Sequence, residues 1–409
     1  MTRSLSRQMT SGYPPYISSM PTLGFKYIFP KKANKEAIFP LNQKKCYFFF
    51  SARYAIASGI KVLGIGPHDV ILLPSYNCGT EIDPILHLGI RPVFYKIGKN
   101  LLVDIDDLLK KITKDVKAIL VTHFLGFPQR IDEIKKICVE KNLFLIEDCA
   151  HAFLSTNNGK YLGSCGDIGV FSLLKTLPVP NGGVLVINNK NIKHKHNPKK
   201  PSMFSIFFYT AEDLLQRKTS TNNHRETVIR IFKRSLYLFS RSIKFYVAVF
   251  RKLFNHKGLY LVRPDSSLFV ENLSSWGMSS LSKNIISNTD FEKVKNIRRR
   301  NFKYLLNHFL ENEQMILPFR ELPPGVSPLF FPIIIESAEK KEALYKTLKS
   351  KGISTNPWWV RFHPDVPWDE FPDAVYLIQK LFGLPIHQNL TLRHLDRVIE
   401  EFEKAYQSL

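Results

Sequence analysis

The chain has 409 residues, 44% hydrophobic and 23% charged, which is enough for a large core and argues against disorder. Its net charge of +23 favours an anionic partner, such as a phosphorylated substrate, a membrane surface or nucleic acid. The five cysteines are odd in number and form no CxxC pair, so neither a disulfide framework nor a metal site is expected.

The N-terminal part of the chain is expected to be an irregular arm. Five prolines between residues 14 and 40 discourage long helices and strands, so we assign residues 1–45 to this arm. The first sixteen residues lack the apolar segment of a signal peptide. There is also no uncharged apolar run of about 18 residues that could span a bilayer. We therefore expect a cytoplasmic protein.

A regular alternation of strands and helices follows the arm. The expected buried strands are short, rich in β-branched or aromatic residues and bounded by turn residues. They are residues 70–74, 92–95, 118–123, 143–148, 168–173 and 183–188. Helical patterns at 104–112 and 130–142 separate some of these strands. This order predicts an α/β fold with a mostly parallel sheet covered on both faces, in a large domain of residues 46–270.

A basic insertion at about residues 193–270 interrupts the alternation. Residues 191–270 hold sixteen Lys and Arg and four acids, and 16 − 4 = +12 is about half of the net charge. Basic residues within 227–254 recur at steps of three, four and seven, which predicts one stripe along an amphipathic helix. The stripe consists of Arg230, Arg234, Arg241, Lys244 and Arg251.

Two interpretations of this stripe stay open. It fits a solvated helix face, and it also fits a peripheral contact with anionic lipid headgroups at the inner face of a membrane. Nucleic acid is disfavoured because no recognisable binding module accompanies the charge.

A smaller α+β domain is expected from residue 271 to 409. Its predicted elements are helical patterns at 271–286 and 290–313, a strand at 329–336, a helix at 339–352, a turn at 384–391 and a final helix to residue 409.

An acid and a lysine follow two of the predicted strands. Asp148 ends the strand 143–148, and Lys175 lies just past 168–173. Alone, the acid could cap a helix or pair with a cation, and the lysine could be solvated. Ligands of open α/β sheets bind beyond the carboxyl ends of the strands. There the pair suits pyridoxal phosphate: the lysine forms a Schiff base with its aldehyde, and the acid keeps the ring nitrogen protonated.

Four stretches in this order resemble one enzyme family. They are "PVFYKIGKNLLVDIDDLLKKITKDVKAILVTHFLGFP", "IEDCAHA", "GSCGDIGVFSLLK" with a later "NGG", and "LPIHQNLT". Together they resemble the DegT/DnrJ/EryC1/StrS aminotransferases over about residues 48–192 and 275–405. The resemblance implies a pyridoxal-phosphate enzyme of fold type I that acts on nucleotide-linked keto-sugars and works as a homodimer.

The resemblance also assigns roles to single residues. Asp148 matches the acid that contacts the pyridine nitrogen, and His151 matches a position near the phenolic oxygen of the cofactor. A histidine satisfied within the core is the alternative for His151. Ser172 matches a phosphate-binding hydroxyl, and Lys175, seven residues before Gly182, matches the Schiff-base lysine.

The expected phosphate turn consists of Ala52, Arg53 and Tyr54, whose backbone amides would bind the phosphate at the start of a helix. Unlike the family pattern, this turn lacks Gly-Thr.

Further departures from the family lie close to the lysine. The gap between Ser172 and Lys175 is two residues shorter than usual, and Asn181 stands where an acid is common. Cys78 occupies the position of the aromatic residue that stacks on the cofactor ring. Tyr76 could substitute for that aromatic.

These observations predict an aminotransferase that moves an amino group from glutamate to a keto-sugar nucleotide, in polysaccharide or amino-sugar biosynthesis. Two alternatives are a keto-sugar dehydratase, in which a histidine replaces the lysine, and a non-catalytic binding protein on the same fold. The acceptor pocket is expected to include Trp358, Trp359, Arg361 and His363, because aromatics and an arginine suit a sugar and its phosphates.

Overall fold

The computed structural model describes residues 16–23, 38–201, 206, 269–312, 314–357, 359 and 362–409. The predicted basic helix at 227–254 and the residues Trp358 and Arg361 lie outside this part of the chain. Within it, no helix is both long and apolar enough to cross a membrane.

The described residues form a seven-stranded sheet with the strand order β1–β9–β8–β5–β4–β2–β3. The strands are β1 (Cys46–Phe49), β2 (Val70–Pro74), β3 (Arg91–Tyr95), β4 (Val116–Thr122), β5 (Phe144–Asp148), β8 (Ile168–Ser172) and β9 (Gly183–Ile187). The six predicted strands are confirmed to within two residues at each end. Their apolar runs are buried because helices cover both faces of the sheet.

The mostly parallel sheet is confirmed, with one reversed strand. The strands from β8 through β5, β4 and β2 to β3 are parallel, whereas β9 is antiparallel to both of its neighbours. The connection from β8 to β9, residues 173–182, is too short for the crossover that a parallel pair needs. Strand β1 was not predicted, because its apolar run is only five residues long and adjoins the irregular arm.

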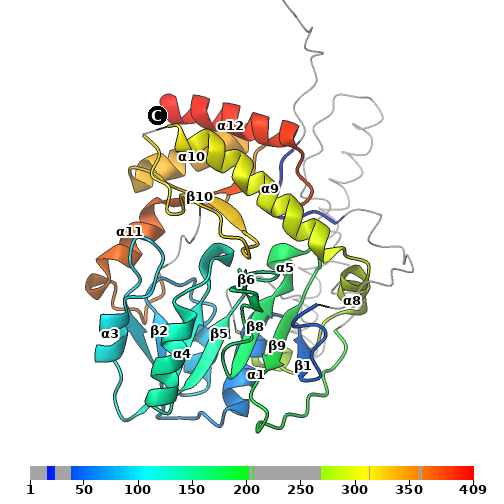
Figure 1. Ribbon diagram of the computed structural model, residues 1–409, viewed down its shortest axis with the longest axis vertical. Coiled ribbons are helices and arrows are strands. Elements are labelled where there is room, and N and C mark those ends of the chain that lie inside the picture. The colour runs from blue at the N-terminus through cyan, green and yellow to red at the C-terminus, as the bar shows by residue number, and fades with distance from the viewer. Residues whose placement is uncertain are drawn as a thin grey trace, which may run out of the picture.

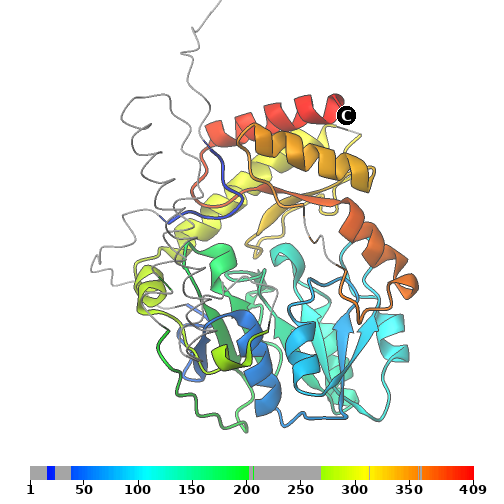
Figure 2. The same cartoon turned by 180° about the vertical axis from the view of Figure 1, so that it is seen from behind.

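Helices cover the sheet on both sides (Figures 1 and 2). They are α1 (Ala52–Val62), α2 (Ile82–His87), α3 (Ile105–Lys110), α4 (Ile131–Glu140), α5 (Leu173–Thr176) and α8 (Ser280–Ser287). Helix α4 lies on one face and α1 on the other. The predicted helices at 104–112 and 130–142 are confirmed as α3 and α4. The two hairpin strands β6 (Thr156–Asn157) and β7 (Lys160–Tyr161) pair with each other beside the sheet.

The C-terminal region is a two-stranded sheet covered by helices at the top of Figure 1. Its elements are α9 (Phe291–Leu310), β10 (Phe330–Ile334), α10 (Ala338–Ser350), α11 (Pro372–Lys380), β11 (Leu381–Pro385) and α12 (Leu392–Gln407). The turn predicted at 384–391 was wrong for its first two residues. Leu384 and Pro385 end β11, because they pair with Phe331 and Phe330 in β10.

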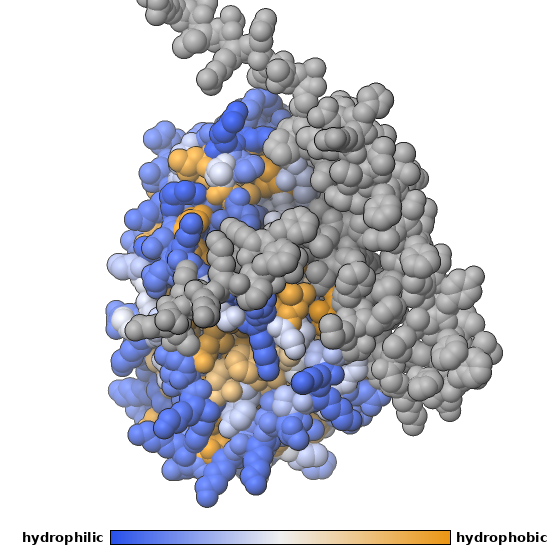
Figure 3. Space-filling view, turned by 90° about the vertical axis from the view of Figure 1, so that its right-hand side faces the viewer, coloured by the Kyte–Doolittle hydropathy of each residue, from blue (hydrophilic) through white to orange (hydrophobic). Residues whose placement is uncertain are grey.

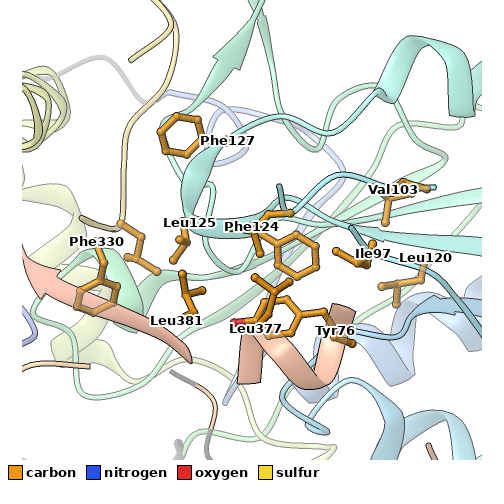
Figure 4. Packing of buried hydrophobic residues seen from close by; sticks show 14 of the residues in the cluster. Tyr76, Ile97, Val103, Leu120, Phe124, Leu125, Phe127, Phe330, Leu377 and Leu381 are labelled. Carbon is orange, nitrogen blue, oxygen red and sulfur yellow. The ribbon is translucent and has the colours of Figure 1, made fainter. Parts of the chain in front are cut away.

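One buried cluster joins the large sheet to the C-terminal region (Figure 4). Tyr76 and Phe124 follow strands of the large sheet and share this cluster with Leu377 of α11 and Leu381 of β11. The C-terminal region is therefore packed beside the carboxyl edge of the sheet. Residue Met278 belongs to a second buried cluster with residues of β8 and β9, so the segment after residue 270 first packs on the large sheet. A domain division at residue 270 stays a prediction.

On the face shown in Figure 3, the described residues are mostly hydrophilic, and hydrophobic residues gather toward the middle.

Candidate active site

A cavity of about 250 Å³ opens at the carboxyl edge of the large sheet. Residues that end or follow β1, β2, β4, β5 and β8 line it, as expected for a ligand site in an open α/β sheet. Most of the predicted site residues meet here. They are Ala52, Arg53, Cys78, Asp148, His151, Ser172 and Lys175. Segments far apart in the sequence thus converge on one space.

Lys175 reaches the cavity from the single turn of α5, directly after β8. The turn is closed by the Leu177 N–H, which donates to the Leu173 carbonyl at 2.8 Å. The Leu173 N–H donates to the Gly182 carbonyl at 3.0 Å. The gap between Ser172 and Lys175 is two residues shorter than in the family pattern, yet the amine of Lys175 still lies in the cavity.

The Nζ atom of Lys175 lies 2.9 Å from Nε2 of His151. The Leu125 N–H donates to Nδ1 of the same ring at 3.4 Å. Burial, and secondarily the nearby Lys175, hold the pKa of His151 well below its usual range. His151 is therefore an uncharged ring whose Nε2 atom faces the amine of Lys175.

Asp148 is buried at the end of β5, and its Oδ1 accepts from the Ala150 N–H at 2.9 Å. Burial raises the pKa of Asp148 to about 6, with a further contribution from the charge of Glu81. Lys175 and the Ala150 N–H act in the opposite direction. A cation placed in the cavity would favour the ionised form of this acid.

Ser51 and the first turn of α1, which begins at Ala52, form a site suited to an anion, here called the phosphate cradle. Ser51 precedes the helix, and its buried hydroxyl has no hydrogen-bond partner among the described residues. The first turn of α1 carries no acid, so no side chain of this turn offsets the positive end of the helix dipole. A Cβ atom at Gly183 would overlap the backbone of Ser51 and Ala52, so glycine is required where β9 passes the cradle.

A second hydroxyl faces the same space. Thr122 ends β4 and lines the cavity, and its buried Oγ1 is likewise without a partner in the described part of the chain. Buried hydroxyls normally form hydrogen bonds. The hydroxyls of Ser51 and Thr122 are thus available to form hydrogen bonds with a polar ligand. Ser172 also lines the cavity.

Residues 40–203 match the model of the DegT/DnrJ/EryC1/StrS aminotransferase family. This part of the chain belongs to that family.

Two related sequences each match about a third of the chain. GDP-perosamine synthase of Vibrio cholerae is 35% identical over 144 residues, which cover 34% of this chain and 39% of that protein. GDP-perosamine synthase of Escherichia coli O157:H7 is 34% identical over 141 residues, or 34% of this chain and 39% of that protein. The chain thus matches about two fifths of the length of these relatives.

Solved structures of aminotransferases share the fold over most of the chain. Aminotransferase TlmJ from Streptoalloteichus hindustanus is 20% identical, with a TM-score of 0.60 and coverage of 89% of this chain and 86% of that chain. The PLP form of Spr1654 from Streptococcus pneumoniae is 18% identical, with a TM-score of 0.62 and coverage of 89% and 88%. These likenesses show that the chain has the fold of this group of enzymes.

Two residues assigned by the family resemblance lie outside the cavity lining. The Tyr54 N–H donates to the Ser51 carbonyl at 3.2 Å, and its hydroxyl accepts from the Val270 N–H at 3.3 Å. Tyr76 packs against Phe124 and Trp359, with ring centroids 5.3 and 4.5 Å apart. An aromatic residue that does line the cavity is Trp359, whose ring centroid lies 5.7 Å from that of His151.

Glu81 is a cavity residue that the sequence did not reveal. It is buried, and its carboxylate accepts from the Cys78 N–H at 3.4 Å and from the Cys78 thiol at 3.1 Å. Burial, together with the charge of Glu81, raises the pKa of Cys78 to about 12. Cys78 is therefore a neutral thiol and not a nucleophile.

Ser51, Thr122 and Glu81 were all missed. Ser51 had a usable signal, because it stands directly before the predicted phosphate turn. His363, expected in the acceptor pocket, is not in the cavity lining and lies 3.4 Å from Asp83.

The buried residues His123, Glu147 and Cys149 lie close enough together to suggest a metal site. Glu147, however, already accepts hydrogen bonds from His123 at 3.0 Å and from the N–H groups of Gly163 and Gly166. Its carboxylate holds the loop before β8, which is a structural role.

Proposed function

We propose that this protein is a pyridoxal-phosphate-dependent aminotransferase that transfers an amino group, with glutamate as donor, to a keto-sugar nucleotide. The observation that supports it most is the meeting of Lys175, His151 and Asp148 in one cavity that also contains the start of α1. Family membership and the shared fold agree with this activity.

The residues around the cavity fit the cofactor. An amine is available at Lys175, and the buried acid Asp148, whose pKa is raised, would gain a further counter-charge from a protonated pyridine. The unpartnered hydroxyls of Ser51 and Thr122 offer hydrogen bonds to cofactor oxygens. The helix start at Ala52 suits a phosphate group.

Each residue has a distinct task in this proposal. Lys175 would hold the cofactor through its amine and, once released, would carry a proton between the donor carbon and the cofactor. Asp148 would keep the proton on the pyridine nitrogen, and His151 would orient the amine of Lys175. Ser51, Ser172 and the amides that begin α1 would bind the phosphate. The bound cofactor supplies an electron sink that makes the α-proton of the donor acidic.

The names of the relatives support a nucleotide-linked sugar as acceptor. Besides the two GDP-perosamine synthases, dTDP-4-dehydro-2,3,6-trideoxy-D-glucose 4-aminotransferase of Saccharopolyspora spinosa is 32% identical over 158 residues, covering 38% of this chain and 41% of that protein. The proposal places Trp359 at the acceptor side of the cavity, where it would contact the sugar ring.

A homodimer in the cytoplasm completes the proposal, with the basic segment 227–254 as a peripheral membrane contact. A role in polysaccharide biosynthesis is supported by spore coat polysaccharide biosynthesis protein SpsC of Bacillus subtilis, 30% identical over 165 residues, covering 37% of this chain and 42% of that protein.

A half-reaction tests the activity. Protein loaded with pyridoxal phosphate is mixed with glutamate, and the cofactor is extracted and separated by chromatography. The proposal expects stoichiometric conversion to pyridoxamine phosphate, followed by return to pyridoxal phosphate when a GDP- or dTDP-linked keto-sugar is added. Lys175→Ala should show no conversion. Wild-type protein that binds the cofactor but never converts it would favour a dehydratase, and protein that binds none would favour the non-catalytic alternative.

A further inference from the structure

Two side chains of the C-terminal region hold the turn that carries Lys175. One Nη of Arg298, in α9, donates to the Thr176 carbonyl at 3.1 Å. Nε2 of Gln388, after β11, donates to the same oxygen at 2.9 Å. Nε of Arg298 also donates to Oε1 of Gln388 at 3.1 Å. The three residues form a closed set of hydrogen bonds next to the lysine.

The Thr176 carbonyl needs these external donors. It belongs to the last residue of α5, where helix carbonyls have no intrahelical partner. Leu177 is extended, with φ −113° and ψ 153°, and the residue four positions after Thr176 is Pro180, which has no N–H. Thr176 is buried, so its carbonyl cannot turn to bulk water instead.

Arg298 is built into this position. Its side chain is 1% exposed, and the salt bridges of the described residues do not include it. Its other Nη donates to the carbonyls of Pro328 and Leu329 at 3.3 and 3.1 Å. A buried cation without a counter-ion is tolerated only when its donors are satisfied, and the guanidinium fork satisfies several carbonyls at once.

The other end of the loop after Lys175 is also held by residues beyond position 270. Asn181 is buried, and its Oδ1 accepts from the Ser279 N–H at 3.1 Å and from the Ser282 hydroxyl at 2.8 Å. The loop is thus held at both ends, and Lys175 lies at the end controlled by α9 and Gln388.

We propose that Arg298 and Gln388 are positioning residues for Lys175, which act on it through the Thr176 carbonyl. The catalytic consequence rests on the proposed function. The placement of the reacting amine then depends on how the C-terminal region packs against the large sheet. This would explain how the enzyme tolerates a connection before the lysine that is two residues shorter than usual.

The variants Gln388→Leu and Arg298→Lys test this inference. The first removes both hydrogen bonds of the Gln388 amide at similar size, and the second keeps the charge but removes the fork. The matched control is Arg299→Lys on the same helix, because Arg299 also donates to two carbonyls, those of Pro323 and Val326, away from Lys175. Thermal unfolding of each variant checks that the fold is retained.

The first readout is independent of the cofactor. Hydrogen exchange of the Leu177 amide, which closes the α5 turn, should become about 10-fold faster in both test variants and stay unchanged in Arg299→Lys. Exchange at the wild-type rate in Gln388→Leu and Arg298→Lys would overturn the inference.

The second readout follows the amine itself. After loading with pyridoxal phosphate, borohydride fixation of the cofactor on Lys175 should be about 10-fold slower in both test variants, and kcat should fall by a similar factor with KM for the donor unchanged. Wild-type rates of fixation and turnover would contradict the inference. Absence of fixation in the wild-type protein would instead overturn the proposed function, whereas exchange at Leu177 would still decide whether the two side chains hold the turn.

Discussion

The imidazole of His151 contacts the amine of Lys175 directly, with 2.9 Å between Nε2 and Nζ. The histidine follows β5 and the lysine follows β8, and these two strands are neighbours in the sheet. The Leu125 N–H fixes the ring from the other side. His151 therefore restricts where the amine can lie within the cavity.

This contact predicts different effects for two substitutions of His151. His151→Gln keeps an amide that can reach the amine, so amino transfer should fall by no more than about 10-fold. His151→Phe fills the same space without a polar atom and should reduce kcat by about 100-fold through misplacement of the amine. Single-turnover rates with glutamate would distinguish them. Equal rates in both variants would show that the contact has no role in transfer.

Asp148 predicts a pH-dependent stability in the cofactor-free protein. Its pKa in the folded state, about 6, is above the ordinary value of 3.8. Its contribution to stability is therefore fully present below about pH 4 and is lost as the pH rises through 6. Asp148→Asn should be more stable than wild type by up to about 3 kcal/mol at pH 8 and equally stable at pH 4.

Urea unfolding at the two pH values measures this difference, and Asp106→Asn, at an exposed position of α3, serves as control. With pyridoxal phosphate added, wild type should become more stable than Asp148→Asn, because the variant has no carboxylate to pair with the ring nitrogen of the cofactor. A cofactor-induced rise in Tm as large in Asp148→Asn as in wild type would speak against the assigned role.

The unpartnered hydroxyl of Ser51 predicts a loss of cofactor affinity without a loss of stability. Ser51→Ala removes a buried hydroxyl that has no hydrogen bond to the described residues, so the cofactor-free protein should keep its stability or gain about 1 kcal/mol. The affinity for pyridoxal phosphate should fall by about 10-fold, because one hydrogen bond to the phosphate is lost. Equilibrium dialysis measures the affinity.

Tyr76→Phe is the matched control for this prediction. The Tyr76 hydroxyl is also buried and without a partner in the described residues, but Tyr76 does not line the cavity. Its removal should leave cofactor affinity unchanged. If Ser51→Ala and Tyr76→Phe changed the affinity for pyridoxal phosphate equally, the proposal that Ser51 binds the phosphate would be contradicted.

Gly183 predicts a steric effect at the same cradle. In Gly183→Ala the new methyl group would overlap the backbone of Ser51 and Ala52, which must shift. We expect a loss of about 2 kcal/mol in stability and weaker cofactor binding. Gly66→Ala is the control, because its Cβ would meet no atom within 4 Å. Calorimetry with and without cofactor measures both effects, and a Gly183→Ala protein with wild-type affinity would contradict the cradle.

Sequence reasoning succeeded where the signal was local. The runs at 70–74 and 118–121 are continuously apolar because both faces of the sheet are buried, so the strands 70–74 and 118–123 were recognisable. Asp148 was found because it ends such a strand, and Lys175 because it lies just past one.

The rest depends on contacts between distant parts of the chain. The direction of β9 follows from the length of a connection, and Glu81 and Thr122 line the cavity without a local signal in the sequence. Nothing around Arg298 in the sequence distinguishes it from its neighbours Arg299 and Arg300. Only the packing of α9 shows which of the three is buried beside the Lys175 turn.

Peptide mapping after borohydride reduction tests the central claim most directly. The full-length protein is incubated with pyridoxal phosphate, reduced and digested, and the modified peptide is identified by mass spectrometry. The account predicts one modified site, Lys175, and no stoichiometric adduct in Lys175→Ala. An adduct on a different lysine, or a protein that takes up no cofactor at all, would contradict it.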